Sequence, residues 1–287
     1  MKCFFATDLH GSIERYERLF TQMIVERPDV VFLGGDFMDG PLRAFAAANP
    51  RISDFLGDYL VPRLLEVKRE MGADWPRVLL ILGNDDGRFI ESAILDAAVR
   101  GCWTYAHDRR IALSENLFAF GYSFVPPSPF MLKDWERYDV SRFVDPGCVS
   151  PEEGRMSVSV EEHVRRYSTI AQDLDSLAGT YSVERSIFLF HAPPYQTALD
   201  RAALDGRRID SAPVDVHVGS IAILRFITDR QPMLTLHGHI HESTRITGQW
   251  HTQIGKTHLF GGAHDGPELA LVRFDTQNLQ AAERLLL

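Results

Sequence analysis

The sequence predicts an α/β protein, and two of its features carry that prediction. Five short apolar runs recur along the chain, and each stops at a polar residue. Between them lie segments whose apolar residues repeat every three or four positions, the spacing of an amphipathic helix. Strands that alternate with helices are the pattern of the α/β class.

The five apolar runs are predicted as the central strands of the sheet. Their apolar residues are continuous rather than alternating, which is typical of strands buried on both faces. In chain order the runs are CFFATD (3–8), VVFLGGD (30–36), VLLILGN (78–84), SIFLFHA (186–192) and MLTLHGH (233–239).

Three helices are predicted in the first part of the chain. Residues 13–24 carry an apolar stripe after Ser12, a residue type that caps helices well. Residues 53–70 also have the helical period, and Pro62 is expected to start or kink a helix there. A third helix is expected over 89–99.

Two more helices are predicted further along. Ser159 and Glu162 form an S-x-x-E capping box, so one helix is expected over 160–177, before Gly179 ends the pattern. Ser220 is expected to cap another helix.

The remaining segments complete a single predicted domain. Residues 111–121 are predicted as a hairpin that turns at 114–116. Residues 121–158 contain prolines and aromatics with little periodicity, and we interpret them as an ordered flap or insertion near the site. Because no repeat or linker interrupts the sequence, 1–287 is predicted to form one domain.

Composition narrows the possible partners. The net charge is −9 and no block of five or six basic residues occurs, which disfavours nucleic acid as a partner. No apolar run reaches the ~20 residues that span a bilayer. The apolar stretch before Asp8 is too short for a signal peptide, and Cys3, Cys102 and Cys148 lie far apart. We therefore expect a cytoplasmic protein, whose oligomeric state the sequence does not indicate.

Each predicted strand ends in residues that can bind a metal ion. The carboxyl ends of strands line the ligand crevice of an open α/β sheet, so these side chains are expected to form one site. They are Asp8, His10, Asp36, Asn84, His191, His239 and His241.

The spacing of these residues supports their convergence. Asp8 and His10 are two positions apart, so in extended backbone they would point the same way, and the same holds for His239 and His241. Asp36 follows Asp8 by 28 residues, about the length of a βαβ unit, and should lie on the neighbouring strand.

The number and type of ligands indicate two metal ions. Seven ligands are too many for one tetrahedral ion and suit two ions that share a bridging carboxylate. All seven offer nitrogen or oxygen and none a thiolate. Two divalent ions are therefore expected, with Mn, Fe or Zn favoured over Mg because four of the ligands are imidazoles.

In this order the motifs resemble those of the calcineurin-like metallophosphoesterase superfamily, whose blocks are DxH, GD, GN, H and GHxH. Here the blocks are Asp8-Leu9-His10, Gly35-Asp36, Gly83-Asn84, His191 and Gly238-His239-Ile240-His241, so the resemblance spans positions 8–241. The chain looks like a small prokaryotic-type branch that has GND in place of GNH.

The resemblance implies a four-layer αββα sandwich with two central mixed β-sheets flanked by helices. HLFGGA and ELALVRFD near the C-terminus would complete the second sheet. It also implies a role for each ligand: Asp8, His10 and His241 hold one metal, Asn84, His191 and His239 hold the other, and Asp36 bridges.

The implied activity is hydrolysis of a small phosphate ester by a hydroxide that bridges two metals. Much of the superfamily has a histidine after the GN asparagine, whereas this chain has Asp85 as the candidate catalytic residue. Substrates with good leaving groups could make an acid unnecessary, His217 or His264 could replace it, or Asp86 could raise the pKa of Asp85. We favour the first account, and therefore a phosphodiester over a phosphomonoester.

Roles are also predicted for Asp86 and for charged and aromatic residues in and near the 121–158 segment. Asp86 is expected to accept backbone donors in the turn before the helix at 89–99. Arg88, Lys133 and Arg137 are candidates to bind phosphate oxygens, and Trp135 could stack on the leaving group. The alternative is that the KDWERYD charges face water. A second function, a catalytically weak binding scaffold with this fold, also remains open.

Overall fold

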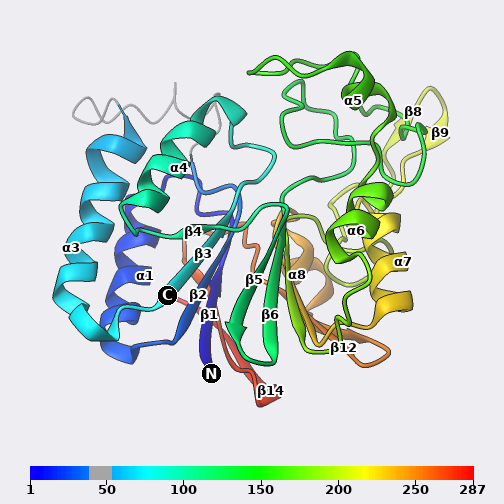
Figure 1. Ribbon diagram of the computed structural model, residues 1–287. Helices are drawn as coiled ribbons and strands as arrows, with labels where there is room; N and C mark the ends of the chain where they lie inside the picture. Colours follow the sequence, from blue (N-terminus) through cyan, green and yellow to red (C-terminus); the bar gives the residue numbers. More distant parts are fainter. Residues whose placement is uncertain (39–53) are drawn as a thin grey trace.

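Two six-stranded sheets face each other at the centre of the computed structural model, which describes residues 1–38 and 54–287 (Figure 1). Helices cover the outer face of each sheet, so the layers run helix, sheet, sheet, helix. The predicted α/β class and the implied αββα sandwich are confirmed.

The first sheet contains β1 (Lys2–Ala6), β2 (Val30–Gly34), β3 (Arg77–Ile81), β4 (Thr104–Tyr105), β13 (Ala270–Asp275) and β14 (Asn278–Leu286). Its order is β14-β13-β1-β2-β3-β4. Strands β1 to β4 are parallel, while β13 is antiparallel to β1 and β14 to β13, which makes the sheet mixed.

The second sheet contains β5 (Arg109–Ser114), β6 (Leu117–Tyr122), β7 (Ser186–Phe190), β10 (Leu234–His237), β11 (His251–Ile254) and β12 (Thr257–Gly261). Its order is β11-β12-β10-β7-β6-β5, with the two edge strands antiparallel to their neighbours. The expected hairpin is formed by β5 and β6. A separate two-stranded ribbon pairs β8 (Arg208–Ile209) with β9 (Ala212–Pro213).

The helices divide between the two outer faces (Figure 1). Beside the first sheet lie α1 (Ile13–Glu26), α3 (Val61–Met71) and α4 (Glu91–Val99), with the short turns η1 (Phe55–Leu60), η2 (Gly72–Asp74) and η3 (Arg88–Ile90). Beside the second sheet lie α6 (Ile170–Ala178) and α7 (Ile221–Arg230). The shorter helices α5 (Glu162–Tyr167) and α8 (Ser243–Thr247) join loops.

Successive side chains of a central strand point alternately into two apolar layers, which explains the continuous apolar runs. In β1, Phe4 belongs to the layer that contacts the helices and Phe5 to the layer between the sheets. The inter-sheet layer draws on both sheets, with Phe32 from β2 and Phe260 from β12. Both faces of the central strands are therefore covered, and every position on them can be apolar.

The five predicted strands and most helices are confirmed, with shorter strand ends. The run at 30–36, for example, stops being a strand after Gly34, because the polar residues beyond it form the loops of the site. HLFGGA supplies β12 of the second sheet as expected, but ELALVRFD forms β13 of the first sheet, where it pairs with β1. Ser12 caps α1, its hydroxyl accepting the Arg15 amide at 3.4 Å, and Pro62 lies in the first turn of α3. Position 53, the start of the predicted 53–70 segment, lies outside the described residues.

The prediction of one helix over 160–177 is wrong. The segment forms two helices, α5 and α6, separated at Ser168 and Thr169. Thr169 has extended backbone and caps α6 in a reciprocal capping box with Gln172. The predicted capping box of Ser159 and Glu162 is therefore wrong: α5 begins after Glu161 without a side-chain cap, and the observed box belongs to Thr169, which pairs with Tyr138 and starts a second helix.

The segment predicted as a flap lies where β1, β2 and β3 end, at the top of Figure 1. Residues 123–161, all of them described, form neither a helix nor a strand, yet isolated pairings such as Val125 with Glu136 hold them in place. Asp134 also accepts the backbone amide of Arg88 at 2.7 Å. The segment is thus joined to the loop that follows Asn84. Among the described residues, no helix has the length and apolarity needed to cross a bilayer.

Candidate metal centre

The loops that follow five strands bring the predicted ligands together. Asp8, His10, Asp36 and His241 form one group whose donor atoms lie within 4.8 Å of one another, and Asp36, His191 and His239 form a second. Asp36 belongs to both groups, which is the arrangement expected of a bridging carboxylate. The predicted convergence is therefore confirmed, while the binding of metal stays a prediction.

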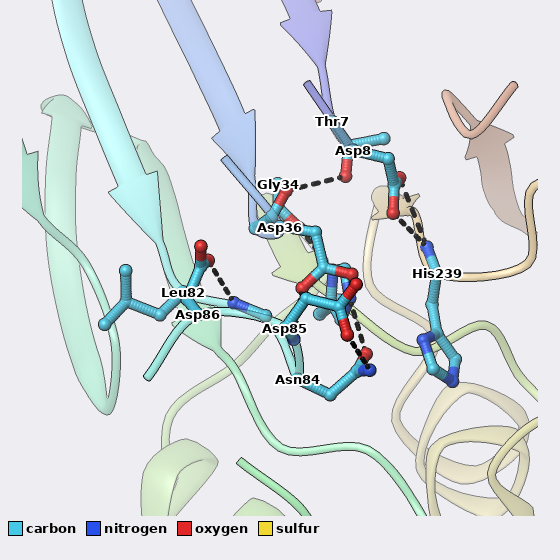
Figure 2. A network of polar contacts seen from close by, with 12 residues as sticks. Thr7, Asp8, Gly34, Asp36, Leu82, Asn84, Asp85, Asp86 and His239 are labelled. Atoms are coloured by element: carbon cyan, nitrogen blue, oxygen red, sulfur yellow. Dashed lines mark hydrogen bonds and ion pairs between the residues drawn. The ribbon is translucent and has the colours of Figure 1, made fainter. Parts of the chain in front are cut away.

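Within each group, the nitrogen and oxygen atoms that could bind a metal lie close to one another. In the first group, Nε2 of His241 lies 3.0 Å from Nε2 of His10 and 3.2 Å from Oδ1 of Asp8. In the second, Nε2 of His191 lies 3.2 Å from Oδ2 of Asp36 and 3.1 Å from Oδ1 of Asn84. Figure 2 shows the Asp36, Asn84 and Asp85 side chains gathered at one point. Asn84 thus joins the second group, as the sequence predicted.

The backbone at the site differs from the expected extended form. Asp8, His10, Asp36 and His239 have φ values of 54°, 46°, 48° and 73°, in the left-handed region. The prediction that Asp8 and His10 point the same way by strand alternation is wrong, because tight turns direct them instead. Non-glycine residues in this region cost free energy and concentrate at functional sites.

Hydrogen bonds hold the ligands in these turns. Nδ1 of His191 donates to the carbonyl of Gly34 at 2.8 Å, which directs Nε2 at Asp36. The amide of His239 donates to the Asp8 carboxylate at 3.1 Å, a contact drawn in Figure 2. The Arg15 guanidinium donates to the carbonyl of Asp8 at 2.6 Å. Sequence analysis missed Arg15, although it lies in the first turn of the helix that follows the Asp8-Leu9-His10 motif.

Two glycines leave the space in which the donors meet. A Cβ added at Gly83 would collide with Oδ1 of Asp36 and lie 2.6 Å from Nε2 of His191. A Cβ at Gly238 would lie 2.6 Å from Oδ2 of Asp8. The glycines of the GN and GHxH motifs therefore keep the donors close enough to share a ligand.

The site stabilises positive charge. Burial opposes a charge on His191, yet the Asp36 carboxylate outweighs it and raises the pKa of His191 to about 10. His241 behaves similarly, because its hydrogen bond to Asp8 raises its pKa despite burial. Burial also works against ionisation of Asp8 and Asp36, but the neighbouring imidazoles lower the pKa of both carboxyl groups.

His239 is held neutral, as a metal ligand must be. Burial lowers its pKa to about 3, and the charge of His191 adds to the effect. The protons that His191 and His241 hold would be released when a metal binds. Carboxylates, an amide oxygen and imidazoles that converge on two centres fit divalent cations of the Mn, Fe and Zn type. The residues present are therefore suited to the predicted pair of ions.

Asp85 lies at the accessible side of the centre, with its side chain 38% exposed. Its amide donates to Oδ1 of Asp36 at 2.8 Å, and its Oδ1 accepts the Asn84 side chain at 3.3 Å. Burial and then the charge of Asp36 raise the pKa of Asp85 to about 6. The expectation that Asp86 would raise it is corrected, because the main neighbouring charge is Asp36.

Asp86 has a wider role than the local turn predicted for it. Its buried carboxylate accepts the amide of Gly83 at 2.9 Å, which confirms the local part of the prediction. It also accepts the amides of Phe37 and Met38, directly after Asp36. Burial and the charge of Asp36 raise the pKa of Asp86 well above its usual value. Asp86 therefore ties the Asp36 loop to the Asn84 loop.

The prediction that Lys133 and Trp135 bind the substrate is wrong. Both side chains are 0% exposed, so neither reaches a substrate. Lys133 pairs with the equally buried Glu136, and Trp135 packs in the aromatic core beneath the segment. The alternative that the KDWERYD charges face water is also wrong for these residues, because the segment folds its charges inward.

Arg88 and Arg137 are partly accessible, so their predicted binding roles stay predictions. Arg88 pairs with Glu91 at 3.2 Å and Arg137 pairs with Asp173. His217 and His264, the possible replacements for the missing histidine, belong to neither donor group. His217 pairs with Asp200 at 2.8 Å and His264 with Glu268 at 2.9 Å.

Comparison with known proteins gives a family-level match. A family model described as calcineurin-like phosphoesterase matches residues 1–243, whereas no curated protein matches the sequence. The solved structure of TT1561 from Thermus thermophilus has 15% identity and a TM-score of 0.56, covering 99% of this chain and 98% of that one. A dimetal phosphatase from Danio rerio has 15% identity and a TM-score of 0.51, covering 95% and 92%. At such identities the likeness shows a common fold.

Proposed function

Because this chain belongs to the calcineurin-like phosphoesterase family, we propose that it is a metal-dependent hydrolase that prefers phosphodiesters. The observation that carries the proposal is the position of Asp36, whose carboxylate is shared by both donor groups. The first ion would be held by Asp8, His10, Asp36 and His241. The second would be held by Asp36, Asn84, His191 and His239.

Two divalent cations at these positions would lower the pKa of water and neutralise charge on the phosphoryl oxygens. The chain's own task is to keep its metal ligands in place. Arg15 and the amide of His239 do this by donating hydrogen bonds to Asp8, and Asp86 does it by accepting the amide of Gly83. Manganese, iron or zinc would suit the mixed imidazole and carboxylate set, and we propose a small phosphate ester as substrate in a cytoplasmic enzyme.

Asp85 supports the preference for diesters on two grounds. It presents a carboxyl group where much of the family presents an imidazole, and two divalent cations at the centre would favour its ionised form although burial and Asp36 raise its pKa to about 6 without them. It would then be a weak source of a proton for a poor leaving group. Its negative charge at the accessible side of the centre also repels a monoester dianion more than a diester monoanion. Both effects lower the rate for monoesters.

Hydrolysis of bis-p-nitrophenyl phosphate and of p-nitrophenyl phosphate, each with added Mn²⁺, tests the proposal. The wild-type protein should hydrolyse the diester faster, and Asp36→Ala should lose at least a hundredfold of that rate. The rival scaffold function predicts no metal-dependent turnover of either compound. A faster reaction with the monoester would overturn the diester preference and leave the hydrolase assignment intact.

A further inference from the structure

The loop over residues 262–268 lies at the same edge of the sheets as the candidate metal centre. β12 precedes the loop and is parallel to β10, so both strands end at the ligand edge. β13 follows the loop and is antiparallel to β1, so it begins near the point where β1 ends, shortly before Asp8. The loop therefore crosses from the second sheet to the first beside the Asp8 turn. It also lies beyond residues 1–243, which the family model covers.

The start of the loop packs closely against the end of β1. The amide of Gly262 donates to the carbonyl of His237 at 2.9 Å, just before the GHxH motif. A Cβ added at Gly262 would lie 2.9 Å from Cγ2 of Thr7, the residue before the DxH motif. From the first sheet, Arg284 on β14 donates to the carbonyl of Ala263 at 2.9 Å. These contacts fix the loop next to two of the ligand motifs.

Arg15 joins the loop to the backbone of Asp8. One terminal nitrogen of its guanidinium donates to the carbonyl of Asp8 at 2.6 Å, and the other donates to the carbonyl of Gly266 at 2.5 Å. Nε donates to the carbonyl of Pro267 at 3.5 Å, a weaker third contact. Because the guanidinium fork is rigid, these acceptors fix Asp8 relative to the loop. Asp8 has a left-handed φ of 54°, a costly conformation that persists only where surrounding contacts hold it.

The loop also contacts the helix that follows the ligand His241. Asp265 accepts the Arg245 guanidinium at 2.6 Å. Arg245 belongs to α8, which begins two residues after His241. The Arg245 side chain is 61% exposed, so this ion pair is expected to contribute less than the contacts of Arg15. The loop is thus connected to segments that carry Asp8 and His241, both members of the first donor group.

We propose that the 262–268 loop, through Arg15, positions Asp8 for the first metal ion. The proposal rests on the proposed function and extends it, because it assigns part of the metal centre to a segment beyond the family match. Arg15 is a positioning residue and would not touch the ion. Its positive charge alone would weaken the binding of a cation, so any favourable effect must come from the geometry that it imposes on Asp8.

Titration of Mn²⁺ into metal-free protein tests the proposal without relying on activity. Arg15→Gln should weaken the affinity for one of the two ions by about tenfold or more and leave the other within about twofold. Arg15→Lys keeps the charge but lacks the fork, so it should recover part of the loss. Arg18→Gln is the matched control, because Arg18 lies one turn later on α1 and pairs with the exposed Glu14. It should bind both ions as the wild type does.

The affected ion is identified in variants that disable one donor group. Combined with His241→Ala, which removes a ligand of the first group only, Arg15→Gln should cause no further loss of Mn²⁺ affinity. Combined with His191→Ala, which removes a ligand of the second group only, Arg15→Gln should still weaken the remaining ion. Hydrogen exchange in EDTA examines the metal-free protein, where the amides of residues 7–11 and 262–268 should exchange faster in Arg15→Gln than in Arg18→Gln.

The outcomes separate this proposal from the proposed function. A wild-type protein that binds no Mn²⁺ would refute the proposed function and the positioning role together. If the wild type binds two ions, the positioning role alone is overturned by Mn²⁺ binding or hydrogen exchange that is equal in Arg15→Gln and Arg18→Gln, by equal weakening of both ions, or by a loss that persists beside His241→Ala. If Arg15→Gln does not fold, the same comparisons apply to Arg15→Lys.

Discussion

The carboxylate of Asp85 lies beside the imidazole of His10, with Oδ2 3.7 Å from Nδ1. Asp85 therefore adds a negative group to the edge of the first donor group, where a substrate would approach. This contact connects the departure from the GNH motif to the choice of substrate.

The first prediction concerns this side chain. Asp85→His should raise monoesterase activity relative to diesterase activity by about tenfold or more, because an imidazole can donate a proton and removes the repulsion. Rates on p-nitrophenyl phosphate and bis-p-nitrophenyl phosphate give the ratio. An unchanged ratio would show that the identity of residue 85 does not set the substrate range.

The second prediction concerns the link between two ligand loops. Asp86→Ala leaves the amides of Phe37, Met38 and Gly83 without their acceptor and should cost about 3 kcal/mol of unfolding free energy. Urea unfolding in EDTA measures that loss. Because the loops carry Asp36 and Asn84, the affinity for Mn²⁺ should fall as well, and Asp86→Asn should show smaller losses. An unaltered Mn²⁺ affinity would limit Asp86 to a structural role.

The third prediction compares two glycines. Gly83→Ala should abolish Mn²⁺-dependent activity, because the new Cβ would collide with Oδ1 of Asp36. Gly248→Ala is the control: its φ of 72° makes alanine strained, but no atom lies within 4 Å of the added Cβ. The control should lose about 1 kcal/mol of stability and keep its activity. Equal activity in the two variants would contradict the crowding of donors around Gly83.

The fourth prediction concerns the buried ion pair of Lys133 and Glu136. Lys133→Met leaves Glu136 buried without its partner and should cost about 3–5 kcal/mol of unfolding free energy, with kcat and KM of the folded protein unchanged. Adding Glu136→Gln should recover part of that loss. A selective rise in KM with normal stability would restore Lys133 as a substrate-binding residue.

Much of the fold and the site could be predicted from sequence because both depend on local patterns. The continuous apolar runs mark strands covered on both faces, and the polar residue after each run marks the edge where parallel strands end. Asp8, Asp36 and His191 were found in this way, although far apart in sequence.

The errors come from contacts between distant segments. The break between α5 and α6 depends on pairing of Thr169 with Tyr138, and the segment that buries Lys133 is held by the hydrogen bond of the Lys133 amide to the carbonyl of Arg155. The left-handed backbone at Asp8 and His10 follows from hydrogen bonds between loops, such as that of Asp8 with Gly35. Such contacts leave no periodic signal in the sequence.

Metal content measures the central claim most directly. After equilibration with Mn²⁺ and removal of the free ion, the wild-type protein should retain about two ions per chain, and Asp36→Ala should retain fewer than one because both donor groups lose a ligand. Asp200→Asn, which alters a buried carboxylate outside both groups, should retain the wild-type content. A wild-type protein without bound Mn²⁺, Fe²⁺ or Zn²⁺, or equal metal content in wild type and Asp36→Ala, would contradict the shared-carboxylate centre.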